Sequence, residues 1–250
     1  MDPQDLVILC AAFFIVAVFY TTVGHAGASG YLAMMALVGL APDVMRPTAL
    51  ALNIVVAVFT VYRFRRARFF SWPGLWPFLL GSAPFAAVGG IQSLSRGTYY
   101  VVMGLVMLFA AGYLTWRAFG RRPLMEERVV RVRKIPAVFI GCIIGFISGI
   151  IGVGGGIFLS PVLLILGWAG PRTTAGIAAP FILVNSAMAL SAGSLTVQKL
   201  PGELPLLAAA AMGGAVLGTW LGLERLKQKG LLVTLAIVMS LAGVKLIVTA

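Results

Sequence analysis

The sequence Gly152-Val153-Gly154-Gly155-Gly156 lies inside an apolar run from Ile135 to Trp168 and decides how that run can fold. Each glycine inside a helix costs up to about 1 kcal/mol relative to alanine, so this cluster, with β-branched Val153 inside it, predicts a break. Backbone N–H and C=O groups freed within hydrocarbon are tolerated only where protein or a polar cavity surrounds them. We therefore expect the break to line a polar site.

The segment after this break, residues 157–168, predicts a new half-helix. Its first N–H groups have no carbonyl partner, and the helix dipole is positive at that end. An anion can approach this backbone closely because glycine has no Cβ. The alternative is that the glycines only let two helices pack closely, but such packing usually uses small residues four apart. The pattern favours a binding break, of the kind that transporters use at mid-membrane.

The composition places the chain in a membrane. It is 60% hydrophobic and 10% charged, with a mean hydropathy of +1.03. Its apolar runs are long enough to cross a bilayer. The alternating segments of about ten residues that are typical of an outer-membrane barrel are absent. We expect an all-α polytopic membrane protein with glycine-broken helices at its centre.

The first apolar run, Leu6–Tyr20, follows Asp2 and Asp5 rather than a basic region, so we expect a retained span and not a signal peptide. The net charge of +12 would suggest nucleic-acid binding in a soluble protein. Here Lys and Arg lie almost wholly in short loops, where membrane topology explains them, and no nucleic-acid partner is expected. Cys10 and Cys142 lie inside apolar runs and indicate neither a disulfide nor a metal cluster.

Ten apolar segments are expected, of which the second and seventh are short enough to be half-helices. They are Leu6–Val23, Gly30–Leu40, Pro47–Tyr62, Trp72–Gln92, Thr98–Trp116, Ile135–Ile151, Ile157–Trp168, Thr173–Gly193, Glu203–Leu223 and Gly230–Val248. Basic clusters follow the third, fifth and ninth segments, at residues 63–68, 117–134 and 225–229. Because short cytoplasmic loops carry an excess of Lys and Arg, these loops are predicted to face the cytoplasm and both termini the periplasm.

The chain also repeats itself. The two clearest matches are Pro73-Gly74-Leu75-Trp76-Pro77 with Pro201-Gly202-Glu203-Leu204-Pro205, and Arg46-Pro47-Thr48-Ala49 with Arg172-Thr173-Thr174-Ala175. They predict two membrane repeats of about five segments each, residues 1–118 and 135–250, joined by a basic cytoplasmic linker over 119–134. Because the number of segments in each half is odd, the second half enters from the opposite side, and the repeats are expected to be inverted.

Gly24-His25-Ala26-Gly27-Ala28-Ser29-Gly30 is the first-half counterpart of the glycine cluster and holds the sole histidine. Ser29 and the amides of Gly30 and Tyr31 are expected to start the short second helix and to offer hydroxyl and N–H donors. Two half-helix N-termini could then converge on one anion. His25 could add a third donor or titrate near neutral pH. The alternative is a buried neutral histidine bonded to a backbone carbonyl.

Other polar residues within the spans are few, and at such depth they usually face the bundle interior. All seven acidic residues lie at termini or loop edges, whereas a cation or metal transporter normally has a carboxylate at its site. We therefore expect an anionic or neutral substrate, with no metal, no cofactor and no catalytic residue. The candidate substrate-binding residues are His25, Gly27, Ala28, Ser29, Gly30, Tyr31, Asn53, Gly152, Gly154, Gly155, Gly156, Ile157 and Asn185.

The form Ser148-Gly149-x-x-Gly152-x-Gly154-Gly155-Gly156, followed by Pro161, resembles the sulfite exporter TauE/SafE family of bacterial inner-membrane transporters. The duplicated hydropathy and the basic central loop add to the resemblance, which covers essentially the whole chain. It is weaker in the first half, where Ala28 and Ser29 replace two glycines. The resemblance implies export of sulfite, sulfoacetate or a related organosulfur anion across the inner membrane. The lipid bilayer, protons as coupling ion and a homodimer are the candidate partners.

Two other functions are the alternatives to transport. Gly27-Ala28-Ser29-Gly30 matches the form around the serine of rhomboid intramembrane proteases. Such a serine needs a base from a separate helix, whereas His25 lies four residues upstream on the same segment. A membrane scaffold that carries no substrate is the other alternative, and it leaves both glycine breaks unexplained.

Overall fold

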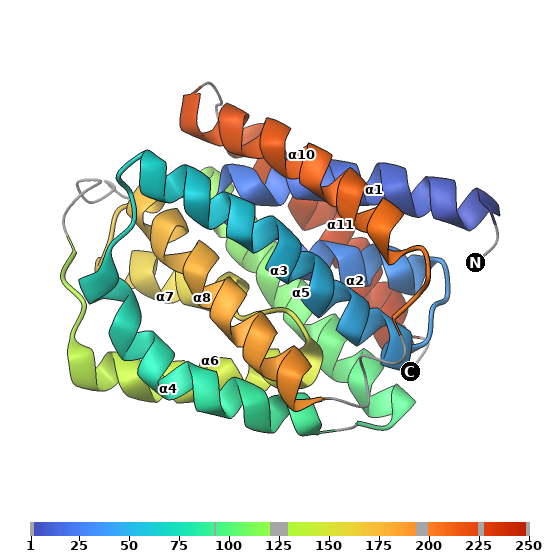
Figure 1. The fold of residues 1–250 in the computed structure, drawn as a ribbon, viewed down its shortest axis with the longest axis horizontal. Helices are drawn as coiled ribbons and strands as arrows, with labels where there is room; N and C mark the ends of the chain where they lie inside the picture. The colour runs from blue at the N-terminus through green and yellow to red at the C-terminus, as the bar shows by residue number, and fades with distance from the viewer. Residues whose placement is uncertain (1–2, 93, 121–129, 194–199, 225–227, 249–250) are drawn as a thin grey trace.

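The computed structural model describes residues 3–92, 94–120, 130–193, 200–224 and 228–248, and Figure 1 labels their helices. These are α1 (Pro3–Thr22), α2 (Ala28–Leu37), α3 (Pro42–Arg66), α4 (Trp72–Ile91), α5 (Arg96–Phe119), α6 (Lys134–Ile151), α7 (Gly156–Ile165), α8 (Pro171–Ala192), α10 (Leu204–Glu224) and α11 (Gln228–Val248). The predicted linker over 119–134 lies largely outside the described residues, and the domain boundaries stay a prediction.

The expected all-α membrane architecture is confirmed. Seven of the described helices are long and apolar enough to cross a membrane. Helices α2 and α7 have only 10 residues each, about 15 Å, or half of a typical hydrocarbon core. Most bounds agree with expectation to within a few residues. Helix α3 is longer than expected because Pro42 rather than Pro47 occupies its first turn, where a proline is tolerated.

Each half contains a helical hairpin made of one long and one short helix. In Figure 1, α2 runs back toward the end of the molecule at which α1 begins, and α7 runs back toward the end at which α6 begins. The Arg131 amide, just before α6, donates to the Trp168 carbonyl just after α7. This hydrogen bond joins the two ends of the second hairpin. The two hairpins therefore enter the fold from opposite ends (Figure 1), and the inverted orientation in a membrane stays a prediction.

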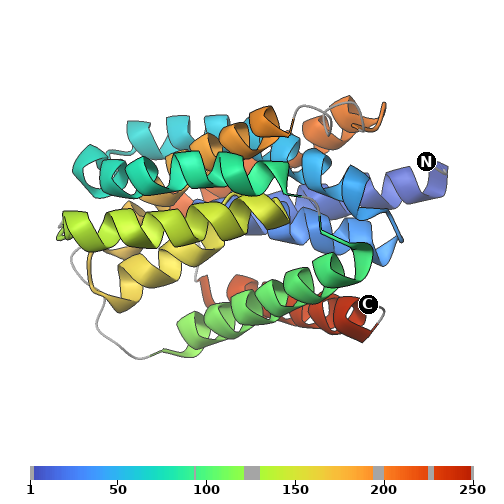
Figure 2. The same cartoon turned by 90° about the horizontal axis from the view of Figure 1, so that it is seen from below.

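Glycines four residues apart hold two pairs of long helices in close contact. A Cβ at Gly141, Gly145 or Gly149 of α6 would collide with backbone carbonyls of α4, which lies beside it (Figure 2). On α10, Gly214, Gly218 and Gly222 approach the carbonyls of α1 in the same way. These are the packing glycines that membrane helices use. The adjacent glycines at 152–156 lie outside both contacts, at the end of α6.

The remaining long helices form the centre and one flank of the molecule. Helix α3 packs against α8 in the centre, between the two hairpins (Figure 1). Helices α5 and α11 pack along each other as a separate pair, which Figure 2 shows beside the main body.

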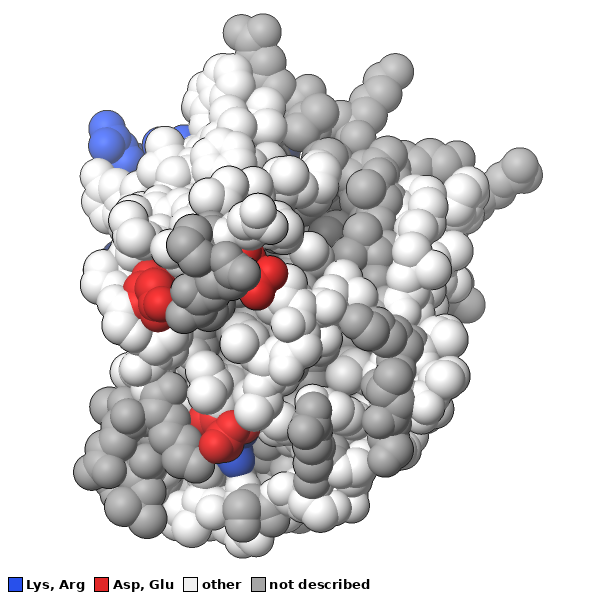
Figure 3. Space-filling view, turned by 90° about the vertical axis from the view of Figure 1, so that its right-hand side faces the viewer, with Lys and Arg blue, Asp and Glu red and all other residues white. Residues whose placement is uncertain are grey.

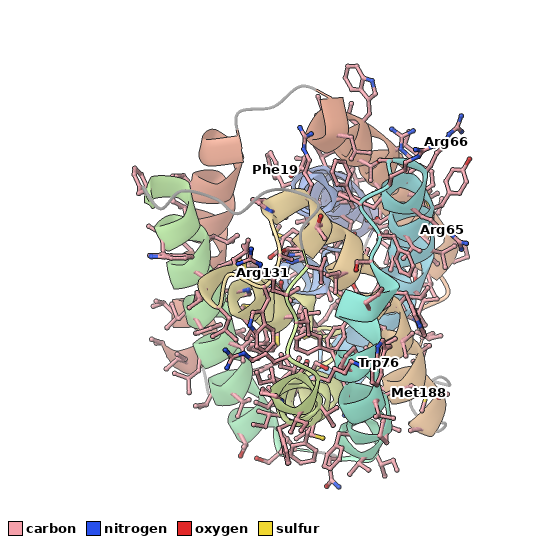
Figure 4. All side chains as sticks on the ribbon, turned by 90° about the vertical axis from the view of Figure 1, so that its left-hand side faces the viewer. Phe19, Arg65, Arg66, Trp76, Arg131 and Met188 are labelled. Carbon is pink, nitrogen blue, oxygen red and sulfur yellow. The ribbon has the colours of Figure 1, made fainter. Side chains whose placement is uncertain are left out.

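The charged ends of the molecule differ. Three acidic residues, Asp5, Asp43 and Glu203, lie in or just before the first turns of α1, α3 and α10, which begin at one end (Figures 1 and 3). Arg65 and Arg66 lie at the last turn of α3, at the opposite end (Figure 4). This distribution agrees in sign with a basic cytoplasmic side. The orientation in the membrane stays a prediction.

Candidate functional site

The first break separates α1 from α2 over residues 23–27. Gly27 has a φ of 109° and is the N-cap of α2, and Gly24 has a φ of 78°. This left-handed region is open to glycine at little cost and disfavours other residues. A Cβ at Gly24 would also collide with Ala175 of α8. The break of the first half is therefore packed against the central helix of the second half.

The second break separates α6 from α7, and it is the glycine cluster that the sequence singled out. Gly152, Gly154 and Gly155 have φ values of 87°, 72° and 81°, and α7 begins at Gly156. A Cβ at Gly152 would lie 2.8 Å from Cγ of Arg46 on α3. The expected interruption of the apolar run is confirmed. Each break packs against the central helix of the other half.

The two breaks meet at a small buried cavity of about 10 Å³. Its lining includes six of the predicted residues, from both halves of the chain. They are His25, Gly27, Ala28, Ser29, Asn53 and Ile157. Tyr20, Ala26, Val153 and Ile182 complete the lining. Because the first residues of α2 and of α7 both border the cavity, the positive ends of two helix dipoles meet there.

The two best candidate donors of the first break have partners in this structure. The Nε2 atom of His25 lies 2.7 Å from Oγ of Ser160 on α7, and Oγ of Ser29 lies 2.8 Å from the hydroxyl of Tyr20. These two bonds give His25 and Ser29 different partners. Because Ser160 belongs to α7, the histidine bridges the two hairpins.

Asn53 of α3 connects the two breaks. Its Oδ1 accepts a hydrogen bond from the Ala28 amide at the start of α2, at 3.1 Å. Its Nδ2 donates to the Val153 carbonyl in the second break and to Oγ of Ser186 on α8, each at 3.2 Å. Buried polar groups usually carry such bonds, because each one left unmade costs about 1–3 kcal/mol. Asn53 therefore fixes both helix starts relative to each other.

Several backbone amides at the breaks stay without a partner. The first bonds of α7 are donated by Phe158 and Leu159 to the Gly155 carbonyl. Within the described residues, the amides of residues 154–157 donate no hydrogen bond that joins them to a carbonyl or side chain. These are the orphan donors of a helix start. In α2 the Tyr31 amide, expected as a free donor, donates to the Gly27 carbonyl instead.

The other predicted residues lie behind or beside the cavity. Gly30 packs against Val16 and Tyr20, and the Tyr31 hydroxyl donates to the Ala26 carbonyl. Gly154 packs against Asn53 and Gly155 against Phe181, and a Cβ at Gly156 would lie 3.5 Å from the His25 ring. Asn185 is fully buried on α8, yet neither of its polar side-chain atoms has a partner. It is absent from the cavity lining, unlike Asn53.

Four residues of this site were not among the candidate substrate-binding residues, namely Tyr20, Arg46, Ser160 and Ser186. Ser160 and Ser186 do belong to the polar residues within the spans that were expected to face the bundle interior. Ser160 lies four residues after the glycine cluster, so its position on the half-helix was the available signal. Arg46 carried a weaker signal, the repeated Arg46-Pro47-Thr48-Ala49. Nothing in the local sequence of Tyr20 separates it from an ordinary residue of an apolar span.

Arg46 holds the helix ends that precede the second break. Its guanidinium donates to the carbonyls of Gly89 and Gly90 in α4, of Gln92 just after α4 and of Gly149 in α6, at 2.6–2.9 Å. The last carbonyls of a helix have no partner within the helix, and cations stabilise that end. Arg46 therefore ties α4, α6 and α3 together at the point where α6 stops.

The lining of the cavity excludes a cation site built from carboxylates. Its lining holds hydroxyl, imidazole and amide groups together with apolar side chains, and no Asp or Glu. Within the described residues, no cluster of three or more His, Cys, Asp or Glu could hold a metal ion. The arrangement can donate hydrogen bonds from two sides to one small anion.

A comparison with protein families identifies the chain. The model of the family described as "Sulfite exporter TauE/SafE" matches residues 9–246, nearly the whole length. The chain belongs to the sulfite exporter TauE/SafE family. This member is 36% identical over 243 residues to a protein of Sinorhizobium fredii (strain NBRC 101917 / NGR234) named "Probable membrane transporter protein y4hK", covering 96% of this chain and 97% of the relative. No solved structure matches it significantly.

Membership settles the class of the protein and confirms the expectation from its glycine motif. The TauE/SafE chain is a multi-pass transporter of the bacterial inner membrane and not an enzyme. The protease reading is not favoured.

Proposed function

We propose that this TauE/SafE protein exports small sulfur-containing anions, sulfite or an organosulfonate such as sulfoacetate, across the inner membrane. The observation that supports this is the meeting of two half-helix N-termini at one buried, carboxylate-free cavity. The anion would bind there and leave without any covalent step.

The donors around the cavity suit an oxyanion. Unpaired amides at residues 154–157 point to anion binding of the kind that helix N-termini provide. At the cavity, Ser29 supplies a hydroxyl group and His25 an imidazole, and Ser160 is the bonding partner of His25. Hydrogen bonds to a charged acceptor are about twice as strong as neutral ones, so the substrate would displace the Ser29–Tyr20 and His25–Ser160 bonds.

The cavity is closed in this conformation. A volume of about 10 Å³ is close to the least that holds one water molecule, too little for a sulfonate group. Substrate binding therefore requires the α2 and α7 starts to separate, with Ile157 and Ile182 as the apolar side chains that move aside. Such rocking of one half against the other is how transporters built from repeats alternate their access.

Reconstituted protein tests the proposal. Proteoliposomes are assayed for flux of sulfite, sulfoacetate, thiosulfate and sulfate, and Ser29→Ala is compared with Ser191→Ala, which changes an exposed serine outside the cavity. We expect saturable flux of sulfite or sulfoacetate. Ser29→Ala should raise the half-saturating concentration by about 2- to 150-fold, the range for one lost hydrogen bond of about 0.5–3 kcal/mol. Flux of no sulfur anion, or equal effects of both variants, would overturn the proposal.

A further inference from the structure

A second hollow, separate from the cavity at the breaks, lies between α5, α6 and α7. It is a groove of about 400 Å³ whose lining residues are all apolar. Phe109 comes from α5, Ile143 and Ile147 from α6, and Phe158 and Ile165 from α7. Its volume falls within the range of about 300–1,000 Å³ typical of ligand pockets. The groove lies on the other side of α7 from His25, because Ile157 borders the cavity and Phe158 borders the groove.

The groove exists because α5 stands away from α6 and α7. Helix α5 packs along α11 and has only slight contact with α6 and α7, and Figure 2 shows the α5–α11 pair beside the main body. The stacked rings of Phe109 and Phe158, with centroids 6.0 Å apart, form one bridge across it. On the other side of the α5–α11 pair the packing is closer, because α11 packs against α2. The hollow therefore lies between α5 of the first half and the α6–α7 hairpin of the second.

The walls of the groove are open to the surroundings. Phe109 is 53% exposed, Ile143 62% and Ile165 54%. All three belong to helices that lie within the membrane, so what fills the groove there must be apolar. A chain of CH₂ groups meets that condition, and a free inorganic anion does not.

One end of the groove carries positive charge. The Arg131 amide donates to the Trp168 carbonyl at 2.8 Å, which fixes Arg131 just beyond the groove residues Ile165 and Leu166. Figure 4 shows Arg131 between α5 and α7 at this end. The Arg131 side chain is exposed, so its guanidinium is free to meet a phosphate group at this end of the groove.

We propose that this groove binds an anionic phospholipid, with one acyl chain along the apolar walls and the phosphate at Arg131. The combination of an apolar channel with a basic end fits both parts of such a lipid, and basic sites between membrane helices bind anionic head groups. A second copy of the chain is the weaker occupant, because it would have to cover Arg131 with acidic groups. The acidic side chains that the structure describes, Asp5, Asp43 and Glu203, lie at the opposite end (Figure 3).

Lipid binding to the purified full-length protein in detergent tests the proposal. Native mass spectrometry and thermal unfolding are followed on addition of phosphatidylglycerol or of phosphatidylcholine with the same acyl chains. We expect phosphatidylglycerol to be retained preferentially and to raise the unfolding temperature more. Arg131→Gln should weaken its binding about fivefold, the loss expected for one basic residue, and leave phosphatidylcholine binding unchanged.

Three controls make the outcome decisive. Arg65→Gln removes the same charge from the end of α3, which Figure 4 shows apart from Arg131, and should keep the preference. Ile143→Trp should fill the groove and weaken retention of both lipids. Glycerol phosphate, which lacks acyl chains, should not stabilise the protein.

Equal losses in Arg131→Gln and Arg65→Gln would overturn the proposal, as would stabilisation by glycerol phosphate alone. A dimer that Ile143→Trp dissociates without any change in lipid binding would assign the groove to a second copy. Because Arg131 is exposed, its variant tests the head-group site even if Ile143→Trp fails to fold.

Discussion

The two glycine breaks have the same shape and different chemistry. In the first, between α1 and α2, the polar groups are side chains, since Ser29 and His25 face the cavity. In the second, between α6 and α7, they are backbone groups, since residues 154–157 carry unpaired amides beside glycines at positive φ. Two helix starts can thus supply complementary donors to one site, one through substitutable side chains and the other through a backbone that only glycine allows.

Side chains of the first half link the two breaks by hydrogen bonds. His25 of the first break bonds to Ser160 of α7, and Asn53 of α3 bonds to the Val153 carbonyl of the second break. Movement of one hairpin relative to the other must break these bonds. The pair of breaks therefore behaves as one unit, and the following changes separate the contribution of each.

The largest expected effect is the all-or-none labelling that decides which side of the membrane each end of α3 faces, and with it the orientation of the first half. Single cysteines replace Asp43 and Arg66, in a chain whose Cys10 and Cys142 are changed to alanine. We expect Asp43→Cys to react with an impermeant maleimide in the periplasm of intact cells, and Arg66→Cys only after the inner membrane is opened, because basic loops stay cytoplasmic. The reverse pattern would contradict the predicted orientation, and equal labelling of both sites would contradict a membrane-spanning α3.

The next largest expected effect is a loss of flux when the backbone of the second break is changed. Gly154→Ala places a Cβ at φ 72°, 2.6 Å from Oγ of Ser186 and 2.7 Å from Nδ2 of Asn53. Gly39→Ala imposes a similar φ of 80° with nothing within 4 Å, so it controls for backbone strain alone. We expect flux in proteoliposomes to fall at least about tenfold in Gly154→Ala, equivalent to about 1.4 kcal/mol, and to change little in Gly39→Ala. Similar flux in both would show that the clash at the break is unimportant.

A smaller effect is expected from the two buried asparagines. Asn53→Leu leaves the Ala28 amide and the Val153 carbonyl unpaired, which costs about 1–3 kcal/mol for each group. Asn185→Leu removes an amide that has no partner, so stability should be unchanged or higher. Thermal unfolding in detergent measures both. If Asn185→Leu destabilises the protein as much as Asn53→Leu does, Asn185 contributes hydrogen bonds of comparable free energy.

The smallest effect is expected from the donor that links the breaks. His25→Gln keeps a side-chain N–H donor that can reach toward Ser160 and removes the only imidazole. If His25 carries a proton during transport, flux of the wild type varies between about pH 5 and 8, and the variant gives a flatter profile. Ser160→Ala removes the partner but keeps the imidazole, so its profile should keep the wild-type shape. Identical profiles in all three proteins would make His25 a structural residue.

Much of the fold was predictable because it depends on local properties. The expected Trp72–Gln92 corresponds to α4 at Trp72–Ile91, since its apolar length and a proline in its first turn mark that helix. The expected Ile157–Trp168 corresponds to α7 at Gly156–Ile165, since adjacent glycines stop one helix and allow the next to start. The site was predictable in outline only. Asn53 and Asn185 looked equivalent, and only Asn53 borders the cavity.

The sequence by itself determined the membrane class, the positions of both breaks, the absence of carboxylates from the middle of the spans and the family, because these follow from composition, glycine spacing and motif. Only the tertiary structure decided that His25 bonds to Ser160, that Arg46 caps α4 and α6, and that α5 leaves a groove beside α7. The physical reason is that backbone breaks arise from neighbours in the chain, whereas a hydrogen bond between residues far apart in sequence depends on how whole helices cross.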